Sequence, residues 1–331
     1  MKTIRWGIIG CGNVTEIKSG PGFQQASNSK LVAVMRRDRA KAKDYAQRHN
    51  VPKWYDDGEK LINDPDVDAV YVATPPNSHE LYTLLAAKAG KPVYVEKPMA
   101  RTFQECQRMV DACNQAKVPL FVAYYRRSLP RYLKIKQLIE SGAIGTPRYV
   151  SVLLHTCIDK DELDPKTLPW RVIPEIAGAG RFLDLASHTL DLMDFFLGPV
   201  ARVSGTAANQ AKLYPAEDIV TTHFTFESGV QGIGVWCFTS FKQYDVNEIT
   251  GSKGRLRFST FAHEPIELHT ADGVEQIPLE NPLHIQQPHI QSIVNELNGQ
   301  GVCPSHGGNA ARTSWVMDEI LKDWRTSQSD K

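Results

Sequence analysis

The first 125 residues alternate short apolar runs with segments in which apolar residues recur at helical spacing. The apolar runs predict five strands, at residues 3–10, 31–36, 68–74, 92–96 and 119–125. Residues 38–49 predict a helix capped by Asp38. Residues 78–90 predict another, which Ser78 caps and Gly90 ends. Strands rich in Val, Ile and Tyr that alternate with helices predict a doubly wound α/β domain, a parallel sheet covered on both faces.

After about residue 145 the pattern changes to runs in which apolar and polar residues alternate. Such alternation predicts antiparallel strands with one exposed face, here at residues 146–156, 201–210, 218–229, 230–238 and 255–260. A long helical segment, residues 181–198, interrupts them, and the tail at 286–325 predicts two helices joined by a glycine-rich turn. We therefore expect one domain at 1–125 and a second, α+β domain at 126–331.

Composition limits the classes of partner. The net charge is +1 and no basic block occurs, so we expect neither nucleic acid nor anionic lipid as a partner. No apolar run approaches the roughly 20 residues that span a bilayer. The six cysteines form no CxxC pair and have no zinc-ligand spacing with histidines, which favours free thiols in a reducing compartment and no bound metal. We therefore expect a cytoplasmic protein.

The sequence GCGNV directly follows the first predicted strand and opens a helix-period segment. In that context Gly10 permits a tight turn, and Gly12 lets a pyrophosphate approach the backbone and the N–H groups of the helix. A complete GxGxxG would have glycine at position 15, where this chain has Thr15, so a simple turn is the alternative. The strand-first context favours a dinucleotide site, with Gly10, Gly12, Asn13 and Val14 as cofactor-binding residues.

The end of the second predicted strand bears on the choice of cofactor. Sites for NAD usually carry a carboxylate there, whereas this chain has Arg36 and Arg37. Guanidinium groups bind a 2′-phosphate that a carboxylate would repel, so the sequence favours NADP(H) over NAD(H). NAD(H) is the alternative if the arginines are solvated and Asp38 binds the ribose.

Several motifs resemble the glucose–fructose oxidoreductase/inositol dehydrogenase/MocA family in order and spacing over nearly the whole chain. They are GIIGCGNV at 7–14, ATPPNSH at 73–79, VEKPMA at 95–100, Trp170-Arg171, Gly178-Ala179-Gly180, Asp184 and His188. The middle glycine of the family pattern is replaced by Ala179, which we expect to be tolerated if its φ is negative. Many relatives have asparagine or histidine near Tyr125, which leaves the substrate open.

The resemblance implies a Rossmann domain followed by a domain with an open, mainly antiparallel sheet that binds substrate and mediates oligomerisation. We therefore expect a homodimer or homotetramer formed through that sheet. The resemblance also implies that Lys97, Asp184 and His188 line the substrate pocket against the nicotinamide. The positions that match cofactor contacts are Thr74, Pro75, His79, Glu96, Lys97, Trp170 and Arg171. Members act on sugars, inositols and related molecules.

Oxidation of a carbinol requires that the hydroxyl proton be removed as hydride leaves the carbon. Asp184 and His188 are four residues apart, so on a helix they project from one face. That polar stripe either faces water or forms a site in which His188 is the acid/base and Asp184 orients it or binds a substrate hydroxyl. Lys97 follows a strand and would stabilise the developing alkoxide; whether it or His188 transfers the proton is open. His155 either contacts substrate or is structural.

The sequence thus predicts an NADP(H)-dependent oxidoreductase that acts on the CH–OH group of a sugar, polyol or cyclitol. One alternative is a relative that uses tightly held NAD for transient oxidation during glycoside cleavage. Another is a non-catalytic NADP-sensing regulator, because the fold can bind cofactor without chemistry. A sensor has no physical need for Lys97, Asp184 and His188 together, which argues against the second alternative.

Overall fold

The computed structural model describes residues 1–329 and shows two compact units. Unit 1 comprises Met1–Leu129 and Asn281–Ala311, and unit 2 comprises Pro130–Glu280 and the chain from Arg312 onward. This division differs from the single boundary expected at 125–126, because a segment of the tail returns to the first unit. The cause is apolar packing: Ile290, Ile293 and Val294 of the tail lie in the core of unit 1.

Unit 1 is built on a parallel sheet of strand order β3-β2-β1-β4-β5-β6. Its strands are β1 Ile4–Ile9, β2 Ser29–Met35, β3 Lys53–Tyr55, β4 Ala69–Val72, β5 Val93–Val95 and β6 Leu120–Val122. The doubly wound α/β prediction and its five strands are confirmed. The edge strand β3 was not predicted, since it has only three residues and all are half-buried. Successive residues of β4 enter two apolar cores, Val70 in one and Tyr71 in the other, so both faces of the sheet are covered.

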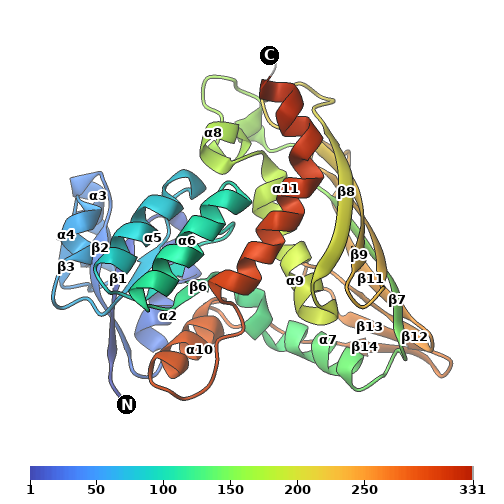
Figure 1. Ribbon diagram of the computed structural model, residues 1–331, viewed down its shortest axis with the longest axis horizontal. Coiled ribbons are helices and arrows are strands. Elements are labelled where there is room, and N and C mark those ends of the chain that lie inside the picture. Colours follow the sequence, from blue (N-terminus) through green and yellow to red (C-terminus); the bar gives the residue numbers. More distant parts are fainter. Residues whose placement is uncertain (330–331) are drawn as a thin grey trace. The chain divides into compact units, whose positions relative to one another are not determined.

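Helices surround this sheet. They are α1 Asn13–Ile17, α2 Gly20–Gln25, α3 Arg39–Arg48, α4 Gly58–Ile62, α5 His79–Lys88, α6 Phe103–Ala116 and α10 Gln287–Leu297, with 3₁₀ turns η1 Pro76–Ser78 and η2 Tyr125–Ser128. Figure 1 shows α10 beside α2, and Ile290 of α10 lies against Gly22 of α2. Part of the tail thus completes the first unit.

The predicted helix boundaries hold with one exception. Asp38 caps α3 by accepting the Lys41 N–H at 3.1 Å, and Gly90 follows α5 with a φ of +71°. Ser78 was predicted to cap α5, but its side chain caps nothing. Instead its hydroxyl donates to Thr74 Oγ1 at 2.8 Å, because Ser78 is the last residue of the 3₁₀ turn η1, which directly precedes the helix.

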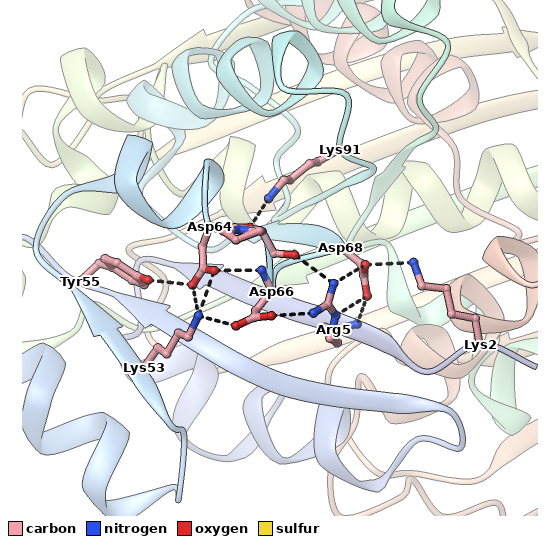
Figure 2. Close-up of polar contacts among 9 residues, drawn as sticks. Lys2, Arg5, Lys53, Tyr55, Asp64, Asp66, Asp68 and Lys91 are labelled. Atoms are coloured by element: carbon pink, nitrogen blue, oxygen red, sulfur yellow. Dashed lines mark hydrogen bonds and ion pairs between the residues drawn. The ribbon is translucent and has the colours of Figure 1, made fainter.

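A charged network covers the end of the sheet at which the strands begin (Figure 2). Asp64 accepts hydrogen bonds from Lys53 and from the Tyr55 hydroxyl. Asp68 pairs with Arg5 at 3.0 Å and with Lys2 at 2.9 Å. These contacts tie β1, β3 and the turn before β4 together at the edge opposite the glycine turn.

Unit 2 is built on an eight-stranded sheet of order β14-β13-β12-β11-β7-β10-β9-β8, antiparallel except for the pair β7 and β10. The strands are β7 Pro147–His155, β8 Val200–Ala208, β9 Ile219–Phe226, β10 Gln231–Cys237, β11 Tyr244–Gly251, β12 Gly254–Phe258, β13 Ile266–Thr270 and β14 Gly273–Ile277. The mainly antiparallel prediction is confirmed. Strands β11, β13 and β14 were not predicted, because their polar side chains, almost all exposed in the edge strand β14, hide the alternation.

The remaining elements of unit 2 are α7 Pro130–Glu140, η3 Lys160–Glu162, η4 Trp170–Val172, α8 Pro174–Ala177, η5 Phe182–Ala186, α9 Ser187–Leu197 and α11 Gly307–Ser329, of which α11 begins in unit 1. Helices α9 and α11 cover one face of the sheet (Figure 1). Phe182 packs edge-on against Trp236 of β10, and Ile320 of α11 lies over Gly205 of β8. Among residues 1–329, no helix is long and apolar enough to cross a membrane.

Candidate active site

The glycine turn lies between β1 and α1 at the carboxyl edge of the parallel sheet. Gly10 has a φ of +92°, and a Cβ there would stand 2.9 Å from the backbone of Ala73 and Thr74. A Cβ on Gly12, in contrast, would meet only one atom within 4 Å, the Gly10 carbonyl oxygen at 3.8 Å. The first glycine therefore lets two strand ends pack closely, and the second leaves its backbone open. An open backbone at this position fits the pyrophosphate of a dinucleotide.

The helix after this turn is short. Helix α1 has five residues, Asn13–Ile17, and the chain turns at Ser19 before α2 begins. Its dipole is correspondingly small, so the turn itself is the main feature that fits a phosphate.

Arg36 and Arg37 follow β2 as predicted. The Arg36 guanidinium donates to the Cys11 carbonyl at 3.3 Å, which places it against the glycine turn. Arg37 and Asp38 are exposed. The Asp38 carboxylate caps α3 and pairs with the Lys41 ammonium at 3.2 Å. The hydrogen bond from the Lys41 N–H contributes most to lowering the pKa of Asp38.

His79 joins two loops at the same edge of the sheet. Its Nε2 lies 2.7 Å from the Thr74 carbonyl, and its Nδ1 lies 3.1 Å and 3.2 Å from the carbonyls of Pro98 and Met99. The ring is buried, and burial lowers its pKa although the carbonyls act to raise it. His79 thus holds the loop after β4 against the loop that carries Lys97, and its contact with the cofactor stays a prediction.

Glu96 anchors that second loop from inside the unit. Its Oε1 accepts hydrogen bonds from the Tyr71 hydroxyl at 2.5 Å and from Gln286 Nε2 at 2.7 Å, and its Oε2 accepts the Lys97 N–H at 3.1 Å. The Tyr94 hydroxyl in turn donates to Gln286 Oε1 at 2.7 Å. A buried carboxylate with three donors is held in one orientation, so the backbone of Lys97 starts from a fixed point.

Tyr71 and Gln286 were not predicted as site residues. Tyr71 looks like any apolar strand residue, and Gln286 is 190 positions from Glu96 in the chain. Only the return of the tail to unit 1 reveals the contact.

In unit 2 the Trp170-Arg171 pair lies at Asp184. Arg171 Nε bonds Asp184 Oδ2 at 2.9 Å, and its guanidinium stacks on Trp170 with 4.5 Å to the ring centroid. The Arg171 side chain is 44% exposed and that of Asp184 13%, so the pair forms a partly open charged surface. Sequence reasoning assigned these residues to different ligands and did not foresee their contact.

The helix that carries Asp184 and His188 is not a regular α-helix. Residues Phe182–Ala186 form a π-helical turn, and α9 continues from Ser187. Such turns are rare and occur often at functional sites. The interpretation in which the polar stripe faces water is wrong, because Ser187, His188 and Asp191 are all buried.

The wall beside His188 is built by a polar loop. The Phe261 ring contacts His188 edge-on at 5.7 Å between ring centroids. Asp245 of β11 holds that loop by accepting the N–H groups of Thr260 at 3.1 Å and Phe261 at 2.6 Å. Asp245 lies in a strand that the sequence pattern did not reveal, so its role was not predicted.

His155 does not join this group. Along β7 the buried side chains are Val150, Val152 and Leu154, so His155 points to the opposite face of the sheet, where its ring lies 5.7 Å from that of Tyr244. Phe182 packs on the buried face, against Trp236. The prediction that His155 contacts substrate is therefore not supported, because strand alternation turns it away from the helix of His188.

The small residues before the π-helical turn meet different demands. Gly178 ends α8 with a φ of +91°, where a side chain would be strained. Ala179 is buried and is not among the residues with positive φ, so its replacement of a glycine is tolerated as expected. No cluster of residues that could hold a metal ion occurs among residues 1–329.

Comparison with known proteins places these features in a family. The sequence profile described as "Oxidoreductase family, NAD-binding Rossmann fold" matches residues 4–124, and the profile of the GFO/IDH/MocA C-terminal domain matches residues 132–257. An oxidoreductase from Formosa agariphila is 39% identical over 315 residues, which cover 95% of this chain and 97% of that protein.

Two further similarities extend over almost the whole chain. The 1,5-anhydro-D-fructose reductase of Ensifer adhaerens is 29% identical, and the match covers 98% of this chain and 97% of that protein. A crystal structure of an oxidoreductase from Agrobacterium radiobacter, in complex with NAD+, L-tartaric acid and magnesium, shares the fold with a TM-score of 0.84 and 22% identity, covering 97% of this chain and 96% of that one. The chain belongs to the glucose–fructose oxidoreductase/inositol dehydrogenase/MocA family of oxidoreductases.

Proposed function

We propose that this protein is an NADP(H)-dependent oxidoreductase that transfers hydride to or from a carbinol or carbonyl carbon of a sugar, polyol or cyclitol. The observation that carries the proposal is in unit 1. An open glycine turn and an internally anchored Glu96-Lys97 loop lie at the carboxyl edge of one parallel sheet. Ligands of such sheets bind beyond that edge. The similarity to a 1,5-anhydro-D-fructose reductase supports the substrate class.

The preference for NADP(H) is supported by the side chains after β2. Arg36 lies against the glycine turn, while the nearby carboxylate of Asp38 is engaged as a helix cap. In the proposal Gly10, Gly12, Asn13 and Val14 bind the pyrophosphate, and Arg36 and Arg37 bind the 2′-phosphate. Thr74, Pro75, His79, Glu96, Trp170 and Arg171 are proposed neighbours of the cofactor.

The bound nicotinamide would supply or accept the hydride, and the protein must handle the proton and the charge on oxygen. In the proposal Lys97 hydrogen-bonds the reacting oxygen and stabilises the developing alkoxide. His188 exchanges the proton with that oxygen, and Asp184, held by Arg171, binds a substrate hydroxyl. His188 is buried, so bulk water has little access to its ring.

Cofactor choice is tested by fluorescence titration of the wild type with NADPH and with NADH. We expect tighter binding of NADPH, and we expect Arg36→Asp combined with Arg37→Ala to reverse the preference. Arg39→Ala is the matched control, since the Arg39 guanidinium is engaged over Trp54 at 5.3 Å. An unchanged NADPH/NADH ratio in the double variant would show that the arginines do not bind the 2′-phosphate.

The substrate class is tested by assaying a panel of aldoses, anhydro sugars, polyols and inositols. The absorbance of the reduced nicotinamide reports turnover. Turnover of at least one group of these compounds is expected, whereas tight retention of cofactor without net turnover of added cofactor would contradict a simple dehydrogenase.

We also propose a homodimer or homotetramer formed through the outer face of the sheet in unit 2. Support comes from incompletely buried apolar side chains on that face, namely Tyr149, Leu153, Ile233, Val235 and Val246. We expect light scattering to give a mass above that of one chain and Ile233→Glu to reduce it. A monomeric wild type would contradict this proposal.

A further inference from the structure

A buried glutamate lies at the start of the helix that carries Asp184 and His188. Glu217 precedes β9 and has no exposed surface. Both of its carboxylate oxygens accept the Gly180 N–H, at 2.9 Å and 2.8 Å, and the Phe182 N–H also bonds it. Gly180 and Phe182 flank Arg181, the residue that directly precedes the π-helical turn. One side chain therefore fixes the point at which that turn begins.

The glycine at position 180 makes this contact possible. A Cβ there would lie 2.8 Å from Ala216 Cβ and 2.9 Å from both the backbone oxygen and Oε1 of Glu217. Any side chain would therefore push the carboxylate away from the N–H that it accepts. Gly180 is needed for close approach, whereas Gly178 is needed for its positive φ.

A second contact holds the same turn by its side chain. Arg181, between the two anchored N–H groups, pairs with Glu162 and Asp159. Glu162 is fully buried. The start of the helix is thus fixed by its backbone through Glu217 and by Arg181 through Glu162. A negative charge at this end also interacts favourably with the helix dipole.

We propose that Glu217 is a positioning residue for Asp184 and His188. By holding the N–H groups on either side of Arg181, it sets where the π-helical turn begins and hence the directions in which the two side chains project. The inference rests on the proposed function, since it assigns Asp184 and His188 to the substrate. Glu217 itself touches neither substrate nor cofactor in this account.

The environment of Glu217 sets how its charge responds to pH. Burial raises the pKa of Glu217 to about 7, although the N–H groups of Glu217, Gly180 and Phe182 act to lower it. The charge of Arg325 in α11 also lowers the pKa of Glu217, and Glu217 in turn raises the pKa of Tyr214 in the preceding loop. A protonated carboxyl keeps only one good acceptor oxygen, so protonation loosens the anchor.

The test is Glu217→Gln, which places an amide NH₂ where one oxygen accepts the Gly180 N–H. We expect kcat to fall roughly 10- to 100-fold, as for other displaced catalytic groups, with the dissociation constant of NADPH unchanged. Asp218→Asn is the matched control. Asp218 is also buried and also accepts two backbone N–H groups, from Gln210 at 2.8 Å and Ala211 at 2.6 Å, but it holds a different loop.

A second readout is independent of turnover. In protein labelled with ¹³C and ¹⁵N at histidine, we expect Glu217→Gln to move the His188 ring signals and Asp218→Asn to leave them in place. Assignment comes from His188→Gln. If the wild type turns over no substrate but this difference is seen, the proposed function fails and the positioning role stands.

Two results would overturn the inference. One is that Glu217→Gln leaves kcat and the His188 signals as in the wild type. The other is that both variants lower kcat in proportion to their loss in Tm, which would make Glu217 a general structural residue. If Glu217→Gln does not fold, Glu217→Asp keeps the charge but withdraws the oxygens by one methylene. It is expected to give an intermediate kcat, and wild-type kcat would count against the inference.

Discussion

At the scale of single residues, some side chains of unit 1 act on their own backbone and others bond a partner outside their own element. Gly10, Asp38 and Gly90 could be predicted because each acts through its own local backbone. The contacts of Ser78 could not, since a 3₁₀ turn precedes its helix, and those of His79 could not, since it bonds carbonyls of two different loops. The pairing of strand ends within a sheet is a long-range property that local pattern does not contain.

Tyr71→Phe tests the anchor of Glu96 at this scale. The change removes one donor from a buried carboxylate and is expected to cost about 1–3 kcal/mol of unfolding free energy. We also expect kcat to fall, because the Lys97 loop is held less firmly. Denaturant unfolding and steady-state kinetics provide the two measurements.

Tyr94→Phe is the control for that prediction. The Tyr94 ring stacks on Tyr71 with 4.7 Å between centroids, but its hydroxyl donates to Gln286 rather than to Glu96. A similar stability loss with a smaller change in kcat is expected. Equal loss of kcat in both variants would show that the hydrogen bond from Tyr71 to Glu96 is not what holds the Lys97 loop.

At the scale of elements, strong periodicity predicted strands and helices, and weak periodicity hid them. The strands of near-continuous apolar residues in unit 1 were predicted, whereas β11 was not, because "YDVNEITG" mixes charge with apolar residues. The helix at 181–198 was predicted, but its π-helical start was not. That irregularity depends on Glu217, which lies 37 residues from Gly180 in the chain.

Gln286→Leu tests whether the returning tail supports unit 1. It removes one donor from Glu96 and leaves the buried Tyr94 hydroxyl without its acceptor. We expect a loss of about 1–3 kcal/mol in denaturant unfolding. Gln287→Leu, one residue further along and only half-buried, should cost less. A larger loss for Gln287→Leu would argue that the tail is held by α10 packing alone.

At the scale of the whole molecule, the two ends of the sheet in unit 1 carry different kinds of residues. The carboxyl edge carries the glycine turn and Lys97, and the amino edge carries the charged network of Figure 2. Burial raises the pKa of Asp64, but hydrogen bonds from Lys53, the Asp66 N–H and Tyr55 outweigh it and bring the pKa to about 2. The pKa of Asp68 is also about 2, since its bonds to Arg5 and Lys2 outweigh burial.

These shifts predict an acid-dependent stability. A carboxyl whose pKa is lower in the folded state stabilises the protein above the unfolded pKa, near 3.8, and that contribution is lost as pH falls toward 2. Unfolding followed by circular dichroism should therefore show a steep loss of stability in this range. Asp64→Asn is expected to make the free energy of unfolding less dependent on pH in this range and to lower it at neutral pH.

Asp66→Asn is the matched control for the charged network. Asp66 shares Lys53 with Asp64, but its side chain is 54% exposed, so solvent screens its ion pair. We therefore expect Asp66→Asn to change the acid dependence of stability less than Asp64→Asn does. An Asp64→Asn variant with the acid profile of the wild type would show that this network does not govern acid stability.

Whether Lys97 acts on the reacting oxygen is tested by measuring the turnover of Lys97→Ala together with its affinity for NADPH. We expect turnover to be abolished while the affinity stays within a few-fold. Lys91→Ala, at the other end of the same strand, where Lys91 bonds the Asp64 carbonyl at 2.7 Å, should keep its turnover. If Lys97→Ala turns substrate over at the rate of the wild type, Lys97 does not act on the reacting oxygen.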